Sequence, residues 1–243
     1  MYLRHVLNGG AGSPEDLTYF LPRLFELWRL YLPTGSVLDD CFFQKLFSDG
    51  FFHQRLALDH REACVRFVDR TFLELIDGLP ALDAPWSEGA RSIAFAWPAI
   101  WYTRGQLGPM KDLWDHWWGL RTTGRARAAA QFASCLVLLQ ESNPFFPAWT
   151  PERGGGPPRL ESNSLGFQEG WLLENVEEFR KRVTISSLVG LIRRCGQALA
   201  SPGESAMVQT LAERLESLPE VAWSNLSELD SSISAAPKWL IVR

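Results

Sequence analysis

The sequence predicts an all-α protein in which helix pairs stack irregularly, as a superhelix-like array or a bundle of about 9–11 helices. Three observations support this fold class. Apolar residues recur at intervals of three and four through most of the chain, which is typical of helices with one buried face. No alternating apolar and polar run is long enough to build a substantial sheet, and no motif recurs at a fixed period.

The first helix has the clearest start signal in the chain. Ser13 can cap it, and Pro14 occupies the first helical position, where a missing N–H costs no hydrogen bond. Apolar residues follow at helical spacing as far as Trp28, and Pro33 ends the element. Pro22 lies inside this pattern, where proline removes a backbone donor and crowds the preceding turn. We therefore expect a kink or a restart at Pro22.

Two helices are expected next, a short one over residues 37–46 and a long one over residues 57–77. Charged residues on the outer face of the long helix are four positions apart, so they can form exposed ion pairs of about 0.2–0.5 kcal/mol each. The expected pairs are Glu62 with Arg66 and Arg70 with Glu74.

The middle of the chain is rich in tryptophan. Ser87 begins a helix that Pro98 interrupts, and Pro109 begins another. The i, i+3, i+4 spacing in the second of these places three tryptophans on one face: Trp114, Trp117 and Trp118. The next helix, residues 125–141, is apolar on nearly every side, which predicts the central buried helix of the fold.

The longest break in the chain covers residues 143–166 and is rich in proline and glycine, so we expect a long surface loop there. Three amphipathic helices follow, with apolar stripes at residues 172–183, 185–199 and 207–218 and with turns at residues 182–184 and 201–203. The turns between them are short, which predicts antiparallel neighbours. We expect a single helical domain over residues 1–243, in which the tail from Pro219 carries no clear pattern.

The charge distribution excludes some classes of partner. The net charge is −4, and acidic residues are concentrated in residues 201–232 while the first 200 residues are nearly balanced. This argues against nucleic acid as a ligand.

The longest apolar runs, residues 92–103 and 128–139, are shorter than the roughly 20 residues that span a bilayer. No secretory signal pattern stands at the N-terminus, so we expect a soluble, cytoplasmic protein with no membrane partner.

The four cysteines are far apart, include no CxxC motif and stand in apolar helical surroundings. This pattern favours reduced, buried thiols in a cytoplasmic protein. The cysteines are Cys41, Cys64, Cys135 and Cys195.

One helix face carries residue types that bind divalent metals: Asp112, Asp115 and His116, in the segment KDLWDHWW. Helical di-iron proteins need a second, Glu-x-x-His set on a facing helix, and the sequence contains none. An exposed polar face beside the Trp cluster is therefore the favoured interpretation, and a helical metal-binding enzyme is an alternative. No GxSxG motif and no P-loop lysine occurs, so neither a catalytic residue nor a cofactor is predicted.

Two stretches resemble a group of uncharacterised bacterial all-helical proteins. The segment DLTYFLPRLFEL, from Asp16 to Leu27, is similar to the DFRYFLPRxLEL segment of that group. The stretch from Gln168 to Leu188, with EGWLLENVEEF and TISSL, is similar to the group's closing helices. The resemblance implies an all-helical fold and carries no catalytic motif. Helical, acidic bacterial proteins of this kind often accompany toxins as immunity proteins, so the analogy implies a protein partner.

The leading hypothesis is therefore a non-enzymatic immunity protein that neutralises a cognate secreted toxin by direct binding. Eleven Trp and fifteen Phe supply aromatic anchors suited to interface hot spots or to the core, and acidic residues could meet a basic toxin. An adaptor or chaperone for a secreted effector is an alternative that shares every sequence feature. The oligomeric state is left open. The expected partner-binding residues are Glu213, Glu216, Glu220, Glu228 and Asp230, with Asp39 and Asp40 as a second patch.

Overall fold

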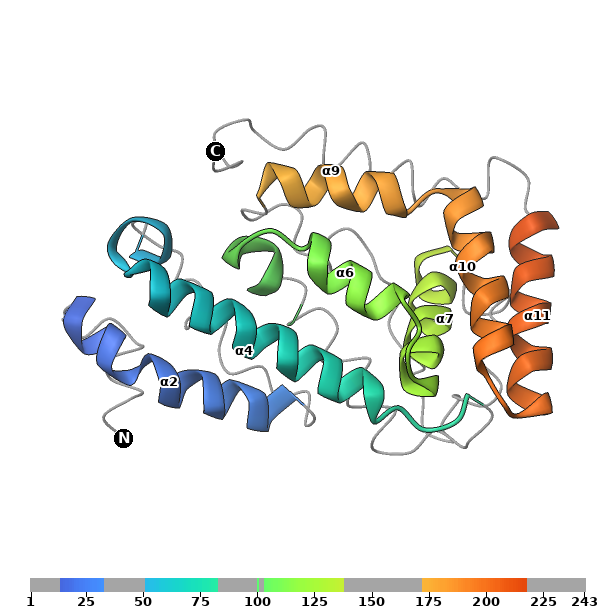
Figure 1. The fold of residues 1–243 in the computed structure, drawn as a ribbon, viewed down its shortest axis with the longest axis horizontal. Helices are drawn as coiled ribbons and strands as arrows, with labels where there is room; N and C mark the ends of the chain where they lie inside the picture. Colours follow the sequence, from blue (N-terminus) through green and yellow to red (C-terminus); the bar gives the residue numbers. More distant parts are fainter. Residues whose placement is uncertain (1–13, 33–50, 83–99, 101–102, 138–171, 218–243) are drawn as a thin grey trace, which may run out of the picture.

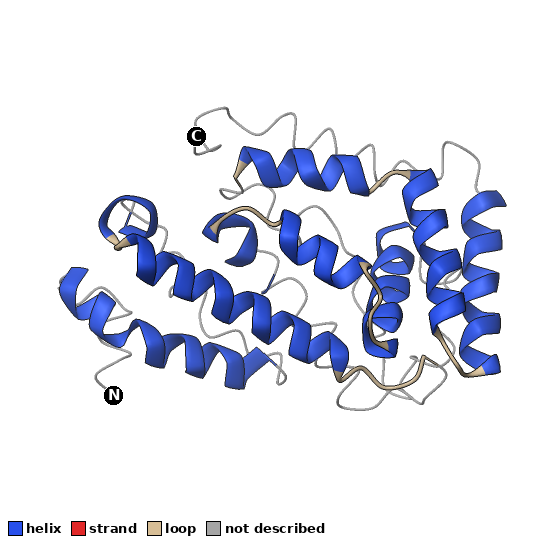
Figure 2. Cartoon of the chain, in the orientation of Figure 1, coloured by secondary structure: helices blue, strands red, loops and turns tan. Residues whose placement is uncertain are grey.

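The computed structural model describes residues 14–32, 51–82, 100, 103–137 and 172–217. Every regular element within these ranges is a helix and no strand occurs in them, which confirms the predicted all-α fold (Figure 2). None of the described helices is both long enough and apolar enough to cross a membrane.

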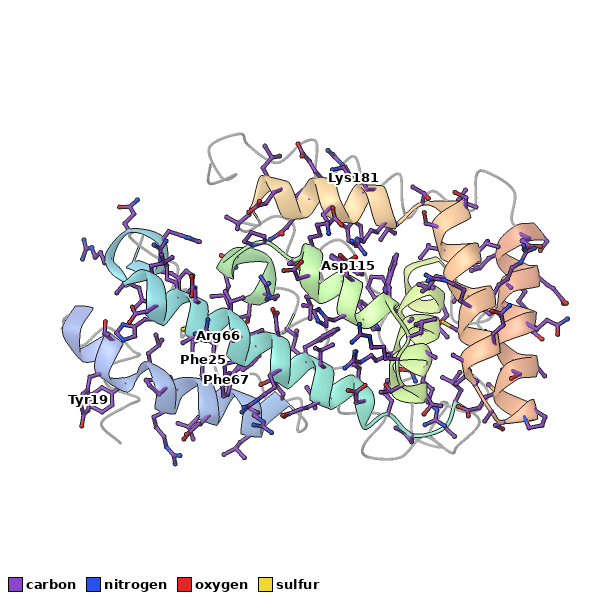
Figure 3. All side chains as sticks on the ribbon, viewed as in Figure 1. Tyr19, Phe25, Arg66, Phe67, Asp115 and Lys181 are labelled. Atoms are coloured by element: carbon purple, nitrogen blue, oxygen red, sulfur yellow. The ribbon has the colours of Figure 1, made fainter. Side chains whose placement is uncertain are left out.

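The N-terminal part of the fold is a pair of helices that lie side by side, α2 (Pro14–Tyr31) and α4 (Leu58–Asp77) (Figure 1). Phe25 packs edge-on against Phe67 between them, with ring centroids 5.7 Å apart (Figure 3). Further along both helices, Arg29 pairs with Glu74 at 2.7 Å. Because the contact positions rise together along the two sequences, α2 and α4 run in the same direction.

Helix α2 begins at Pro14, as the start signal predicts, and Ser13 lies outside the described residues. The helix continues through Pro22 without a restart, and its ribbon bends in the N-terminal half (Figure 1). Pro22 is exposed, so the missing hydrogen bond falls on the solvent side of the helix.

Helix α4 confirms both predicted ion pairs, with Arg66 at 3.3 Å from Glu62 and Arg70 at 3.4 Å from Glu74. A short π-helical turn that the sequence did not predict, η3 (Phe51–Arg55), precedes it. The side chain of Phe52 in this turn is fully buried, which fixes the turn against the core.

The centre of the core is aromatic and lies where α4 meets α6 (Lys111–Trp118) and α7 (Thr123–Val137). Trp114 and Trp117 of α6 stack with centroids 5.2 Å apart, and Trp117 also contacts Phe132 of α7 at 5.2 Å. Phe72 of α4 meets Trp117 at 5.3 Å. All three tryptophans of the predicted face are buried, as expected.

Helix α7 is the buried helix that the sequence predicts. Small side chains let its neighbours approach closely, and its fully buried residues include Ala126, Ala128, Ala129, Ala130, Phe132 and Ala133.

The C-terminal helices are α9 (Leu173–Arg182), α10 (Ile185–Ala198) and α11 (Pro202–Ser217). Helices α10 and α11 lie side by side and antiparallel, as predicted (Figure 1). The same prediction is wrong for α9 and α10, because α9 meets α10 at a corner (Figure 1). The connection explains this corner: Thr184 is extended and caps α10 through the N–H of Ser187, so α10 starts in a new direction and packs on α7 and α11.

Several expected elements lie outside the described residues. They are the helix at 37–46, most of the helix that Ser87 begins, the loop at 143–166 and the tail from Pro219. The last part of the helix that Ser87 begins, residues 103–107, is described and is helical.

Candidate functional site

The described surface is hollowed between α10 and α11, where an open groove has a volume of about 510 Å³. The floor is apolar and comes from both helices: Ile192, Val208 and Ala212. The rim is polar and is formed by Arg193, Gln197, Gln209, Glu213 and Glu216. A cleft with an apolar floor and a polar rim can accept a side chain that has an apolar stem and a polar or charged end.

The sequence brings the two helices together through matching apolar stripes. Leu188, Leu191, Ile192 and Cys195 are buried on α10, and Val208, Leu211, Ala212 and Leu215 are buried on α11. Ser205 also donates its hydroxyl to the carbonyls of Gly196 and Leu199 at 3.2 and 3.1 Å, which fixes the start of α11 against the end of α10.

Two of the predicted partner-binding residues, Glu213 and Glu216, lie on the same rim of this groove. Arg193 crosses from α10 to Glu216 at 2.5 Å, and the amide of Gln209 donates to Glu213 at 3.0 Å. All of these side chains are exposed, so each carboxylate can exchange its present partner for another at little cost. The structure thus brings these two predicted residues together.

The other predicted partner-binding residues lie outside the described part of the chain. They are Glu220, Glu228, Asp230, Asp39 and Asp40.

The residues of the metal-binding alternative do not converge on a free site. Asp115 accepts hydrogen bonds from Lys111 at 2.9 Å and from Arg182 of α9 at 2.6 Å. The hydrogen bonds from these two cations hold the pKa of the Asp115 carboxyl below its usual value. His116 donates from Nδ1 to the backbone carbonyl of Asp112 at 2.6 Å. Among the described residues, no group of three His, Cys, Asp or Glu side chains could hold a metal ion.

Glu204 is the member of the acidic C-terminal region whose position sequence reasoning missed. Its side chain is only 2% exposed and binds Arg127 of α7, so it is not available to a basic partner. A signal was present: Glu204 falls four residues before Val208, on the apolar stripe of α11. A charged residue on a buried stripe indicates a buried ion pair.

A second buried polar cluster, around Arg104, was also not predicted from the sequence. Arg104 binds Asp69 of α4 at 2.5 Å and donates to the carbonyls of Gly108 and Pro109 at 2.7 and 2.6 Å. The side chain of Asn175 in α9 accepts the N–H of Met110 at 2.8 Å and donates to the carbonyl of Gly108 at 2.9 Å. Because these groups satisfy one another, the cluster fixes the segment before α6 and is not a candidate site.

Comparison with protein-family models, with curated proteins and with solved structures found no match to this chain.

Proposed function

We propose that this chain is a binding protein that neutralises a cognate bacterial toxin by direct contact, and that the groove between α10 and α11 is part of the contact surface. One observation carries the proposal: Glu213 and Glu216 lie on one rim of a groove that has an apolar floor. Interface hot spots commonly combine such an apolar pocket with a polar rim.

A basic segment of the partner fits this groove by chemistry. The charged end of a partner arginine or lysine can reach Glu213 or Glu216, while its stem lies along the rim and over the small part of Ala212 that stays exposed. The present pair between Arg193 and Glu216 is exposed, with side-chain exposures of 65% and 42%. Exposed pairs contribute about 0–1 kcal/mol, so an arginine from the partner can replace Arg193 without a large loss.

The test is co-expression with the product of the adjacent gene, followed by co-purification and by a growth assay in cells that produce that product. The proposal expects a stable complex and protection from growth arrest. If no neighbouring product binds and no protection occurs, the immunity proposal is lost.

A double variant, Glu213→Lys with Glu216→Lys, tests the groove itself. Reversal of both rim charges should weaken the complex at least about tenfold, because like charges would then face the partner. The matched control is Glu62→Lys on α4, which also breaks an exposed ion pair on a helix surface. If the double variant binds the partner with unchanged affinity, the groove is not part of the contact surface.

In the alternative function, an adaptor or chaperone binds a secreted effector through the same groove. The identity of the partner separates the immunity function from the adaptor function. A partner that is toxic to the cell supports the immunity function. A partner that is exported together with this chain, and that is harmless without it, supports the adaptor function. For the metal-binding alternative, elemental analysis of the purified protein is the direct test, with His116→Ala as the variant that should lose a bound metal.

A further inference from the structure

The outer face of α2 exposes large apolar side chains. Tyr19 is 79% exposed and Leu30 is 65% exposed, and both belong to the most exposed large apolar residues of the described chain. A helix turns by about 100° per residue, so positions 19, 22, 23, 26 and 30 share one stripe. The buried residues of the helix, among them Leu24 and Trp28, lie on the opposite side. Tyr19 accordingly points away from α4 (Figure 3).

The middle of this stripe carries one charge of each sign. Arg23 binds Glu26 at 2.8 Å within the helix, and the two side chains are 59% and 57% exposed. Along α2 the stripe therefore has the order apolar, cation, anion, apolar, from Tyr19 to Leu30. When two copies of this stripe lie antiparallel, the cation of each copy faces the anion of the other, and the apolar ends face each other.

An antiparallel crossing of two α2 helices uses this complementarity. If a two-fold axis passes between positions 24 and 25, position 19 faces position 30 of the second copy, and position 23 faces position 26. Each Arg23 then meets a Glu26, each Tyr19 meets a Leu30, and every contact occurs twice. This is the pattern of an isologous interface, in which one patch binds the same patch on the other subunit.

We propose that the outer face of α2 is a self-association surface that a second copy of this chain covers with its own α2, antiparallel and related by a two-fold axis. One helix face per copy is smaller than the roughly 800 Å² per partner of a standard interface. The dimer is accordingly weak and forms as the protein concentration rises. Helix α2 lies at the opposite end of the fold from α10 and α11, so the groove stays open in the dimer (Figure 1). The proposal does not depend on the proposed function.

Charge reversal in trans tests this geometry. In Arg23→Glu the stripe carries two acids, and in Glu26→Arg it carries two bases, so each variant alone places like charges across the axis. An equimolar mixture of the two variants places each acid opposite a base. Sedimentation equilibrium should show a wild-type mass that rises toward the dimer, at least about tenfold weaker association for each variant alone, and restored association in the mixture.

The mixture separates association from helix stability, because a weaker helix in either variant cannot be repaired by a second protein. Arg66→Glu on α4 is the matched control, since it makes the same charge change in an exposed helical ion pair and should associate like the wild type. Leu30→Asp tests the apolar end of the stripe and should also weaken the dimer. A wild type that stays monomeric up to millimolar concentration would overturn the proposal, as would unchanged association in the single variants or in Leu30→Asp, or a mixture no tighter than its components.

Discussion

Arg127 of α7 and Glu204 of α11 form a two-bond ion pair that joins three parts of the fold. The guanidinium donates from Nε to Oε1 at 2.7 Å and from Nη2 to Oε2 at 3.0 Å. The same carboxylate accepts the N–H of Leu82 at 2.8 Å, and Arg127 also donates to the carbonyl of Leu79 at 2.9 Å. The pair therefore holds the segment after α4 against both helices.

Removal of Glu204 should be costly. Glu204→Ala leaves the charge of Arg127 largely buried, with a side-chain exposure of 20%, and leaves the Leu82 N–H without this acceptor. Loss of one partner of a buried pair costs about 3–5 kcal/mol, and the partial exposure of Arg127 places the expected loss near the lower end. Urea unfolding measures it. The control is Glu216→Ala, which breaks an exposed pair and should cost less than about 1 kcal/mol; equal losses in the two variants would contradict the prediction.

The same pair should make the fold sensitive to acid. Burial raises the pKa of the Glu204 carboxyl, but the hydrogen bonds from Arg127 and from the Leu82 N–H and the charge of Arg127 together hold it below its ordinary value of 4.5. Because the folded pKa is the lower one, the unfolded chain binds the proton first as the pH falls. This contribution to stability is present above pH 4.5 and is lost as the pH falls through the folded pKa.

Unfolding free energies measured between pH 7 and pH 3 test this acid sensitivity. Glu204→Gln cannot titrate, so it should lose less stability over this range than the wild type does. Part of the pH dependence of stability should persist in the variant, because the hydrogen bonds that Arg125 and Thr122 donate to the Asp77 carboxylate, together with the charge of Arg125, outweigh burial and hold the pKa of Asp77 below its usual value. An equal loss of unfolding free energy between pH 7 and pH 3 in the two proteins would contradict the prediction.

The features of the fold that depend on local pattern could be predicted from the sequence. The start of α2, the extent of α4 and the buried face with Trp114 and Trp117 follow from the proline at the first position of α2 and from apolar spacing, which act within one helix. The exposed pair between Arg23 and Glu26 also follows, because residues three apart are neighbours on any helix.

The features that depend on tertiary contact could not be predicted. Periodicity places Glu204 and Arg127 on apolar stripes but does not say that the two stripes meet. The corner between α9 and α10 depends on which faces pack on α7, and a short connection alone does not decide between a corner and a reversal. For the candidate site, the sequence identifies Glu213 and Glu216 as acids, and only the pairing of α10 with α11 places them beside an apolar floor.

Two glycines should respond to alanine in opposite directions. A Cβ at Gly124, near the start of α7, would lie 2.5 Å from the carbonyl oxygen of Asp77 and would also clash with that of Ile76. Because both neighbours are backbone atoms at the end of α4, Gly124→Ala must shift one helix and should lower the melting temperature by several degrees, for a cost of about 1–3 kcal/mol. Gly190 in α10 has no neighbour within 4 Å of a Cβ, so Gly190→Ala should stabilise by up to about 1 kcal/mol. Thermal unfolding of both variants checks the signs, and a stabilised Gly124→Ala would show that the two helices are not in this close contact.

Cys64 and Cys195 should be inert in the folded protein. Cys64 is 6% exposed and Cys195 is fully buried, and neither forms a disulfide. Burial raises the pKa of each thiol to about 12. At pH 8 about one thiol in 10⁴ is then ionised, and the thiolate is the reactive form. Iodoacetamide labelling of the native protein, read by peptide mass spectrometry, should leave both residues unmodified, while labelling in urea should modify both. Rapid native labelling of Cys195 would mean that α10 and α11 separate readily, because this residue lies on the buried stripe that joins them.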